Sequence, residues 1–159
     1  DTDYDAVVRA RAGLERSELL HHVDHQDLPA ESFVPAPGQG AIAVTARGGG
    51  LADSLRETLD HPPTRVATTV ERTVLAELGG GCVAPIGVNA VLQGSVVHTR
   101  VRVLSTDGTE EVAATRDLPA ERHPEAARDL AAELREQGAA DLIEAAKRDE
   151  ADDAKRENS

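Results

Sequence analysis

Three consecutive glycines, Gly79 to Gly81, separate a helix-like stretch from a strand-like stretch in the middle of the chain. The apolar residues before them, Val66, Val70, Val74 and Leu78, recur every four positions, which is the spacing of one helix face. The glycines end that helix, because they tolerate the positive φ found at helix C-termini. A helix that stops at this loop and a strand that leaves it restrict the fold to a mixed α and β architecture.

The residues after the glycines predict a three-stranded antiparallel sheet. We expect strands over 86–92, 96–104 and 112–118, joined by tight turns at Gln93-Gly94 and Asp107-Gly108. The second strand alternates apolar with polar or charged residues, the pattern of a sheet with one buried face and one wet face.

Helices are expected to cover the buried face of this sheet. Pro124 suits the first turn of a helix whose apolar positions include Leu130 and Leu134. Gly138 interrupts that helix, and a short final helix begins near Asp141. The C-terminal part of the chain is therefore predicted to be an α+β domain: a three-stranded antiparallel sheet covered by helices.

The stretch before residue 64 reads as partial elements of other domains. We expect strands over 4–12 and 41–46, and an amphipathic helix that carries leucines at every fourth position over 51–59. His61-Pro62-Pro63 ends that helix and marks a domain boundary, since two prolines cannot continue it.

Composition excludes several classes of partner. The net charge of −12 argues against nucleic acid and against anionic membranes, because both are polyanions. No apolar run approaches the roughly 20 residues that span a bilayer, and no signal-peptide pattern opens the sequence, so we expect a cytoplasmic protein. Acidic residues far outnumber the cations, only Lys147 and Lys155 are lysines, and aromatics are almost absent. This balance indicates adaptation to high salt.

Cys82 is the only cysteine, and it directly follows the glycines. It cannot form an internal disulfide, which fits a reducing compartment. A thiol on an uncrowded glycine loop is suited to form a covalent bond. The alternative reading, for a lone cysteine, is a small buried hydrophobic residue.

Three ordered stretches carry a resemblance to one family, the porphobilinogen deaminases, also called hydroxymethylbilane synthases. They are Tyr4-Asp-Ala-Val-Val with Ala12-Gly13-Leu14-Glu15-Arg16; Pro35-Ala-Pro-Gly38-Gln39-Gly40-Ala41, closed by Arg47; and Glu71-Arg72 with Gly80-Gly81-Cys82 and Pro85-Ile86-Gly87. The acidic composition suggests a member from a halophilic archaeon.

This resemblance implies an enzyme of tetrapyrrole biosynthesis that joins porphobilinogen molecules head to tail, releases ammonia and forms hydroxymethylbilane. It implies a dipyrromethane cofactor attached by a thioether to Cys82, beside Gly81. Arg16 matches an arginine that binds the carboxylates of cofactor and substrate. Gln39, Arg47 and Arg72 match further substrate-binding positions of the motifs.

The resemblance also implies a division into domains. Residues 1–37 are expected to belong to the second domain, 38–61 to a return segment of the first, and 62–148 to the cofactor-carrying domain, while 149–159 form a disordered acidic tail. The catalytic aspartate of the family is expected in an N-terminal portion outside this sequence. We therefore expect no catalytic residue here, a chain that is inactive alone, and a monomeric protein.

Three alternatives stand beside this interpretation. The chain is a non-catalytic fragment, or a stand-alone α+β module that binds a small molecule. A phosphate-binding loop at Gly79 to Gly81 is disfavoured, because no Lys-Ser/Thr follows and Pro85 begins a strand where such a loop needs a helix. The histidines at positions 21, 22 and 25 read as solvent-facing side chains, so no metal is expected.

Overall fold

The computed structural model describes residues 4–81 and 83–157 of the chain. They divide into two compact units, Asp1–Phe33 and Val34–Ser159. The first unit contains helix α1 (Arg11–Arg16) and a 3₁₀ turn, η1 (Leu20–His22), and Leu20 is its one buried hydrophobic residue within the described part of the chain. The second unit contains the sheet and the remaining helices, and its architecture confirms the α+β prediction.

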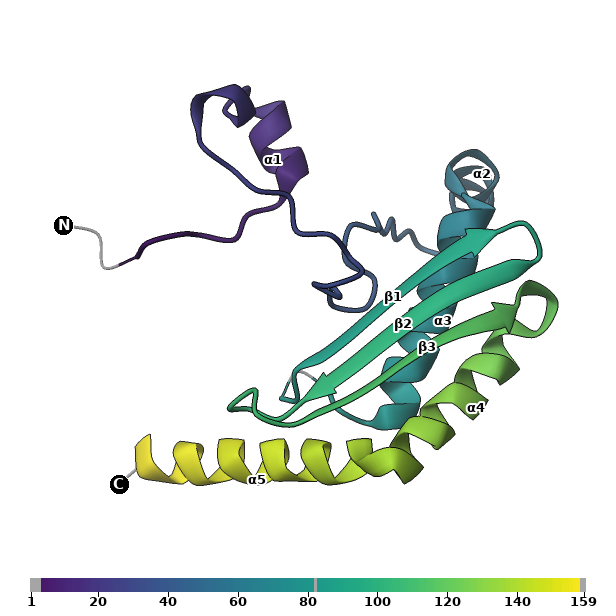
Figure 1. The fold of residues 1–159 in the computed structure, drawn as a ribbon. Coiled ribbons are helices and arrows are strands. Elements are labelled where there is room, and N and C mark those ends of the chain that lie inside the picture. The colour runs from purple at the N-terminus through teal and green to yellow at the C-terminus, as the bar shows by residue number, and fades with distance from the viewer. Residues whose placement is uncertain (1–3, 82, 158–159) are drawn as a thin grey trace. The chain divides into compact units, whose positions relative to one another are not determined.

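The sheet has three antiparallel strands in the order β1-β2-β3: β1 (Ile86–Gln93), β2 (Val96–Leu104) and β3 (Glu111–Pro119). All three agree with the predicted strands to within one residue (Figure 1). In the register Val101 of β2 lies between Val88 of β1 and Ala114 of β3. These three side chains face the core, because every second residue of β2 is buried.

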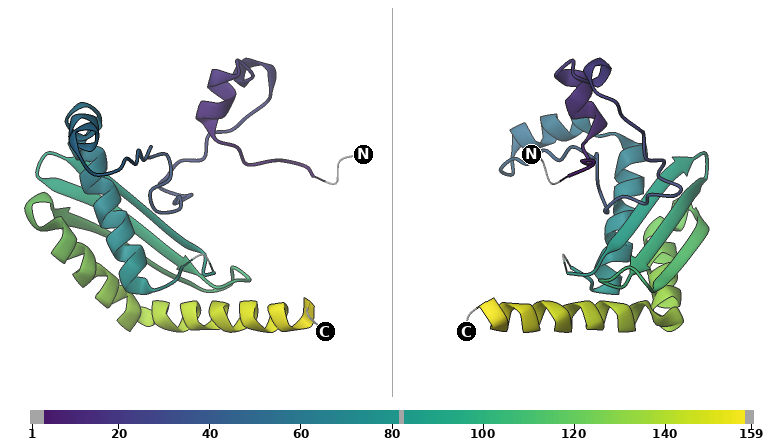
Figure 2. Two further views of the ribbon diagram at one scale, coloured as in Figure 1. Left: turned by 180° about the vertical axis from the view of Figure 1, so that it is seen from behind. Right: turned by 60° about the vertical axis from the view of Figure 1, so that its left-hand side comes forward.

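Two helices, α3 (Pro62–Leu78) and α4 (His123–Leu134), pack on one face of the sheet, as the view from behind shows (Figure 2). No described helix of the second unit covers the opposite face (Figure 1). The core lies between the helices and the sheet, and its most deeply buried large side chains are Val70, Val74, Val88, Val97, Val101, Val103, Leu134 and Ile143. The predicted helix face at every fourth residue is thus confirmed, with Val66 partly buried at its edge.

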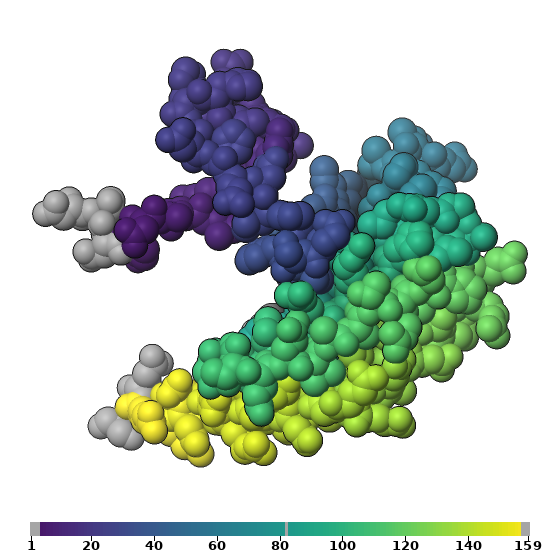
Figure 3. Space-filling view, in the orientation of Figure 1, coloured from purple at the N-terminus to yellow at the C-terminus, as the bar shows by residue number. Residues whose placement is uncertain are grey.

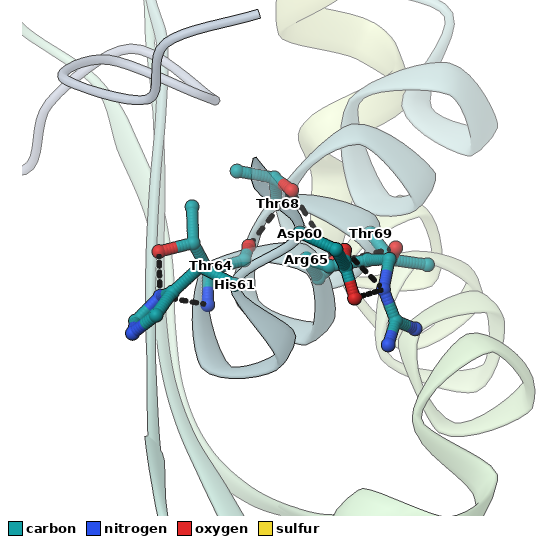
Figure 4. A network of polar contacts seen from close by, with 6 residues as sticks. All are labelled: Asp60, His61, Thr64, Arg65, Thr68 and Thr69. Atoms are coloured by element: carbon teal, nitrogen blue, oxygen red, sulfur yellow. Dashed lines mark hydrogen bonds and ion pairs between the residues drawn. The ribbon is translucent and has the colours of Figure 1, made fainter. Parts of the chain in front are cut away.

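Helix α3 begins at Pro62, because the residues around it cap its first turn (Figure 4). The Nδ1 atom of His61 accepts a hydrogen bond from the Thr64 N–H. Arg65 pairs with Asp60 just outside the helix, at 2.9 Å. Proline suits the first helical position, where its missing N–H would have no partner anyway. The helix ends at Leu78, and the cap residue Gly79 has φ +70°.

The final helix, α5 (Ala140–Glu157), is longer than the short helix that we expected. It continues through the segment from Asp149, for which we expected a disordered tail. A single turn, η3 (Arg135–Ala139), separates it from α4, and within this turn Gly138 has φ +106°. Ion pairs three residues apart, such as Lys155–Asp152, support the helix within this charged segment. Thr106 also donates a hydrogen bond to Asp149, so the β2–β3 turn lies on the helix (Figure 3).

The strands predicted over 4–12 and 41–46 are wrong. Residues 4–10 and 41–46 form no strand, and α1 begins at Arg11. A strand exists only where a neighbour takes up its hydrogen bonds, and the described residues offer neither segment such a neighbour. Their apolar side chains remain outside a core: Val7 is 66% exposed and Ile42 is 84% exposed. The helix predicted over 51–59 is present as α2 (Gly50–Leu59).

Candidate functional site

The loop between α3 and β1 is held at both of its ends. The Gly79 N–H donates to Leu75 O at 3.1 Å and completes the helix end, while the Leu104 N–H of β2 donates to Pro85 O at 3.0 Å. Cys82, the predicted attachment residue, lies outside the described residues. The described ends of this loop are thus fixed, at its entry to α3 and at its exit to the sheet.

Gly80 and Gly81 give this loop two different properties. A Cβ atom on Gly80 would collide with the side chain of Ile86, so the loop packs closely on the first residue of β1. Gly81 is exposed, has φ +55°, and has open space where a Cβ atom would lie. The residue before Cys82 therefore leaves room for a bulky group to approach the backbone.

Gln39 lies in a turn formed with Ala36. Its backbone N–H donates to Ala36 O at 3.0 Å, and its side-chain Oε1 accepts from the Ala36 N–H at 3.2 Å. Gln39 is exposed, and its side-chain amide donors have no acceptor among the described residues. The turn is thus shaped by the backbone N–H and the side-chain oxygen of Gln39 itself.

The segment Val34–Gly38, which we call the strap, runs along the outer edge of β1. The Val88 N–H donates to Pro35 O at 2.9 Å. Beside it, a Cβ atom on Gly87 would lie 2.6 Å from Val34 O, far inside contact distance. Glycine is therefore required at position 87 for the strap to lie against the strand.

Glu71 joins the strap to α3. One carboxylate oxygen, Oε2, accepts from the Gly38 N–H at 2.7 Å, and the other, Oε1, accepts from the Ala90 N–H of β1 at 2.8 Å. The side chain is buried, with 7% of the residue exposed. Burial raises the pKa of Glu71, and the two N–H groups lower it by less.

From the sequence, Glu71 was identified only as part of a family motif, and no role was predicted for it. A signal was present, because this acidic residue lies between Val70 and Val74, which define the buried face of the helix. A carboxylate beside such a face needs hydrogen-bond donors, and backbone N–H groups supply them here.

The three predicted arginines are all exposed and differ in their surroundings. Arg16 ends α1 in the first unit, whereas Arg47 lies in the loop before α2 and Arg72 lies on α3. Within the described part of the chain, none of the three has a side-chain hydrogen bond or ion pair. Arg9 and Arg122 share this property, so the absence of a partner alone does not identify a binding site. By contrast, Arg11 pairs with both Glu15 and Asp27.

Arg72 borders a shallow pocket of about 420 Å³ between α3 and α4. The other residues that line it are Thr68, Thr69, Thr73, Ala76, Glu77 and Arg128. Gln39 and Arg47 are not among these described lining residues, and no hydrogen bond joins the described side chains of Gln39, Arg47 and Arg72. The second unit therefore does not gather its predicted binding residues into one pocket.

The described residues offer neither a metal-binding cluster nor a helix able to cross a membrane. No group of three or more histidine, cysteine, aspartate or glutamate side chains is placed to hold a metal ion. Among the described helices, none combines the length and apolar character that crossing a bilayer requires.

Two family models match this chain, one in its N-terminal part and one in its C-terminal part. Residues 1–52 match the family model described as "porphobilinogen deaminase, dipyromethane cofactor binding domain". Residues 66–137, which include the glycine loop, match the model described as "porphobilinogen deaminase, C-terminal domain".

Individual relatives agree with these models. A probable porphobilinogen deaminase of Halobacterium salinarum is 56% identical over 124 residues, which are 77% of this chain and 31% of the relative. A probable porphobilinogen deaminase of Methanococcoides burtonii is 38% identical over 78% of this chain and 40% of its own length. The porphobilinogen deaminase of Thermobifida fusca is 40% identical over 78% of this chain and 39% of its own length. The chain thus spans about a third of the curated relatives that it matches.

Proposed function

The chain belongs to the porphobilinogen deaminase family, and from this premise we propose that the full-length protein is a hydroxymethylbilane synthase. It joins porphobilinogen molecules head to tail, releases ammonia and forms hydroxymethylbilane. The observation that carries the proposal is the match of two successive domains of one family, in order, to 1–52 and 66–137. A 56% identical relative from a salt-dwelling archaeon supports it.

Cys82 is the attachment residue for the dipyrromethane cofactor in this proposal. The residues around it fit such a group, because Gly81 leaves open space at the backbone and the loop is fixed at both ends. A thiolate is a soft nucleophile that captures the electron-poor carbon left when porphobilinogen loses ammonia, and it forms a stable C–S bond. When bound, the dipyrromethane supplies the free pyrrole position at which the product chain is extended.

Arg16, Arg47, Arg72 and Gln39 are proposed to bind the acetate and propionate groups of the pyrroles. A guanidinium keeps its charge at all relevant pH values and binds a carboxylate with two parallel hydrogen bonds. The three arginines are exposed and have no ion pair within the described residues, so their donors are available for a ligand. The amide of Gln39 offers further donors from its turn.

We place the catalytic aspartate in a portion of the full-length protein beyond this sequence, because no aspartate here matches the family position. Accordingly, the 159-residue chain alone is proposed to be inactive. The full-length protein is proposed to act as a monomer in the cytoplasm of a salt-adapted cell, without nucleic-acid or membrane partners. The strong negative charge of the chain supports the last point.

The mass of the full-length protein purified from its source cells tests the proposal. We expect the mass of the polypeptide plus one dipyrromethane, with the adduct on the peptide that contains Cys82. A Cys82→Ser variant should lack the adduct and lose at least about a thousandfold in the rate of porphobilinogen consumption, because an oxygen nucleophile does not form the stable thioether. Recovery of the adduct on the serine variant would refute the assignment.

The competing reading, a binding module without catalysis, predicts a different result. The native protein would then have the mass of its polypeptide alone, with a free thiol at Cys82. It would not consume porphobilinogen under any condition that supports the related enzymes.

A further inference from the structure

Two loops proposed to face the pyrrole chain are attached to neighbouring residues of one strand. The glycine loop is fixed at Pro85 and Ile86, where it enters β1. The strap is fixed at Gly87 and Val88, the next two residues. Strand β1 therefore sets the spacing between the loop that contains Cys82 and the turn that contains Gln39.

The strap has three attachments, and only one of them depends on the chemistry of a side chain. The Val88–Pro35 hydrogen bond joins two backbone groups, and the close approach at Gly87 needs only the absence of a side chain. The Gly38 N–H, by contrast, is held by the carboxylate of Glu71. Gly38 immediately precedes Gln39, so this attachment is the one nearest to the proposed ligand-binding side chain.

A carboxylate fits this position better than its neutral amide. Each oxygen of Glu71 accepts one backbone N–H, from Gly38 and from Ala90, at 2.7 and 2.8 Å. A glutamine of the same size has one acceptor oxygen, and its NH₂ group would face the second N–H as donor against donor. An aspartate keeps both oxygens but is one methylene shorter, so it does not reach both partners.

We propose that Glu71 is a positioning residue, which holds the Gln39 turn in register with the loop that contains Cys82 through Gly38 and Ala90. Glu71 does not contact the substrate in this role. It acts through the turn that it holds, and so it affects how the growing, polycarboxylate pyrrole chain is bound. The inference rests on the proposed function, which makes Gln39 a ligand-binding residue.

The test compares Glu71→Gln with the wild type in the full-length protein. Hydrogen exchange measured by mass spectrometry should be about tenfold faster in peptides that cover 34–41, because a glutamine accepts only one of the two N–H groups and its NH₂ opposes the other, which loosens the attachment of the strap. Hydrogen exchange of the β2 backbone amides should stay unchanged. The KM for porphobilinogen should rise about tenfold with a smaller change in kcat, since binding is weakened while the cofactor remains attached.

A matched control is Glu125→Gln, the same chemical change on the exposed first turn of α4. It should leave the exchange of 34–41 and the KM at wild-type values. If Glu71→Gln does not fold, Glu71→Asp replaces it, with the same expected directions and smaller effects.

Two results would overturn the inference. One is unchanged exchange in 34–41 for the Glu71 variant. The other is faster exchange there with a wild-type KM, which would make Glu71 a residue of fold stability alone. Failure of the proposed function has a separate signature, namely a wild-type protein that has no dipyrromethane and does not consume porphobilinogen.

Discussion

The carboxylate of Glu71 illustrates how one side chain balances two opposing effects. Burial disfavours its charged form, while the N–H groups of Gly38 and Ala90 favour it. Burial is the larger effect, so the pKa is raised above the ordinary value of 4.5. Between these two pKa values the folded protein keeps a proton that the unfolded chain has already lost.

This difference has a defined sign in the pH dependence of stability. Because the folded state binds more protons in that window, the free energy of unfolding falls as the pH rises through it. We expect the free energy of unfolding of the wild type, taken relative to that of Glu71→Gln, to be largest below about pH 4.5 and to decrease as the pH passes the raised pKa of Glu71. Urea denaturation of both proteins at a series of pH values measures the difference, with Glu125→Gln as a reference that changes an exposed carboxylate and keeps the buried one. A difference that grows with pH would mean that the pKa is lowered.

At the scale of elements, the outer edge of β1 is closed without a further strand. An open edge presents unpaired N–H and C=O groups, which favour aggregation. Here the strap and the Glu71 side chain take up the N–H groups of Val88 and Ala90. The edge is thus covered by the segment that also presents Gln39, so closing the sheet and placing the proposed site use the same contacts.

Gly87→Ala tests this arrangement. The new methyl group would meet the backbone oxygen of Val34, which cannot move without releasing the strap. We expect a loss of about 1–3 kcal/mol in the free energy of unfolding and faster exchange of the Val88 amide. Gly48→Ala is the matched control, because its Cβ atom would enter open space. An alanine at position 87 that leaves both measurements unchanged would show that the strap does not lie on β1.

At the scale of the whole molecule, the net charge is the feature that bears on stability. A net charge of −12 on 159 residues means that the acidic groups repel one another unless salt screens them. The ion pairs on the surface do little to offset this repulsion, because exposed pairs such as Arg56–Asp53 contribute little.

We therefore expect the melting temperature of this chain to rise by on the order of 10 °C between low and molar KCl. The same titration near pH 4.8, where the net charge approaches zero, serves as the control and should show a much smaller rise. A melting temperature that stays constant or falls with KCl at pH 7 would contradict adaptation to salt.

The sequence by itself determined the elements of the C-terminal domain and the family. The helix over 62–78, the three strands and their turns depend on local patterns of apolar residues and glycines, which act over a few positions. The family motifs are likewise contiguous stretches of sequence. The expected strands at 4–12 and 41–46 failed because a strand needs hydrogen bonds from a neighbour, and apolar residues alone do not supply one.

Only the tertiary structure decided how residues from separate motifs act together. Gly38, Glu71 and Ala90 are far apart in the sequence, and their contacts depend on packing α3 against β1 and laying the strap along that strand. Position 87 must be a glycine because the backbone of Val34 lies against it, and Val34 is more than fifty positions earlier in the sequence. Local patterns define elements, because they follow from short-range backbone preferences. The partner of a buried carboxylate is set by long-range packing, which no local pattern contains.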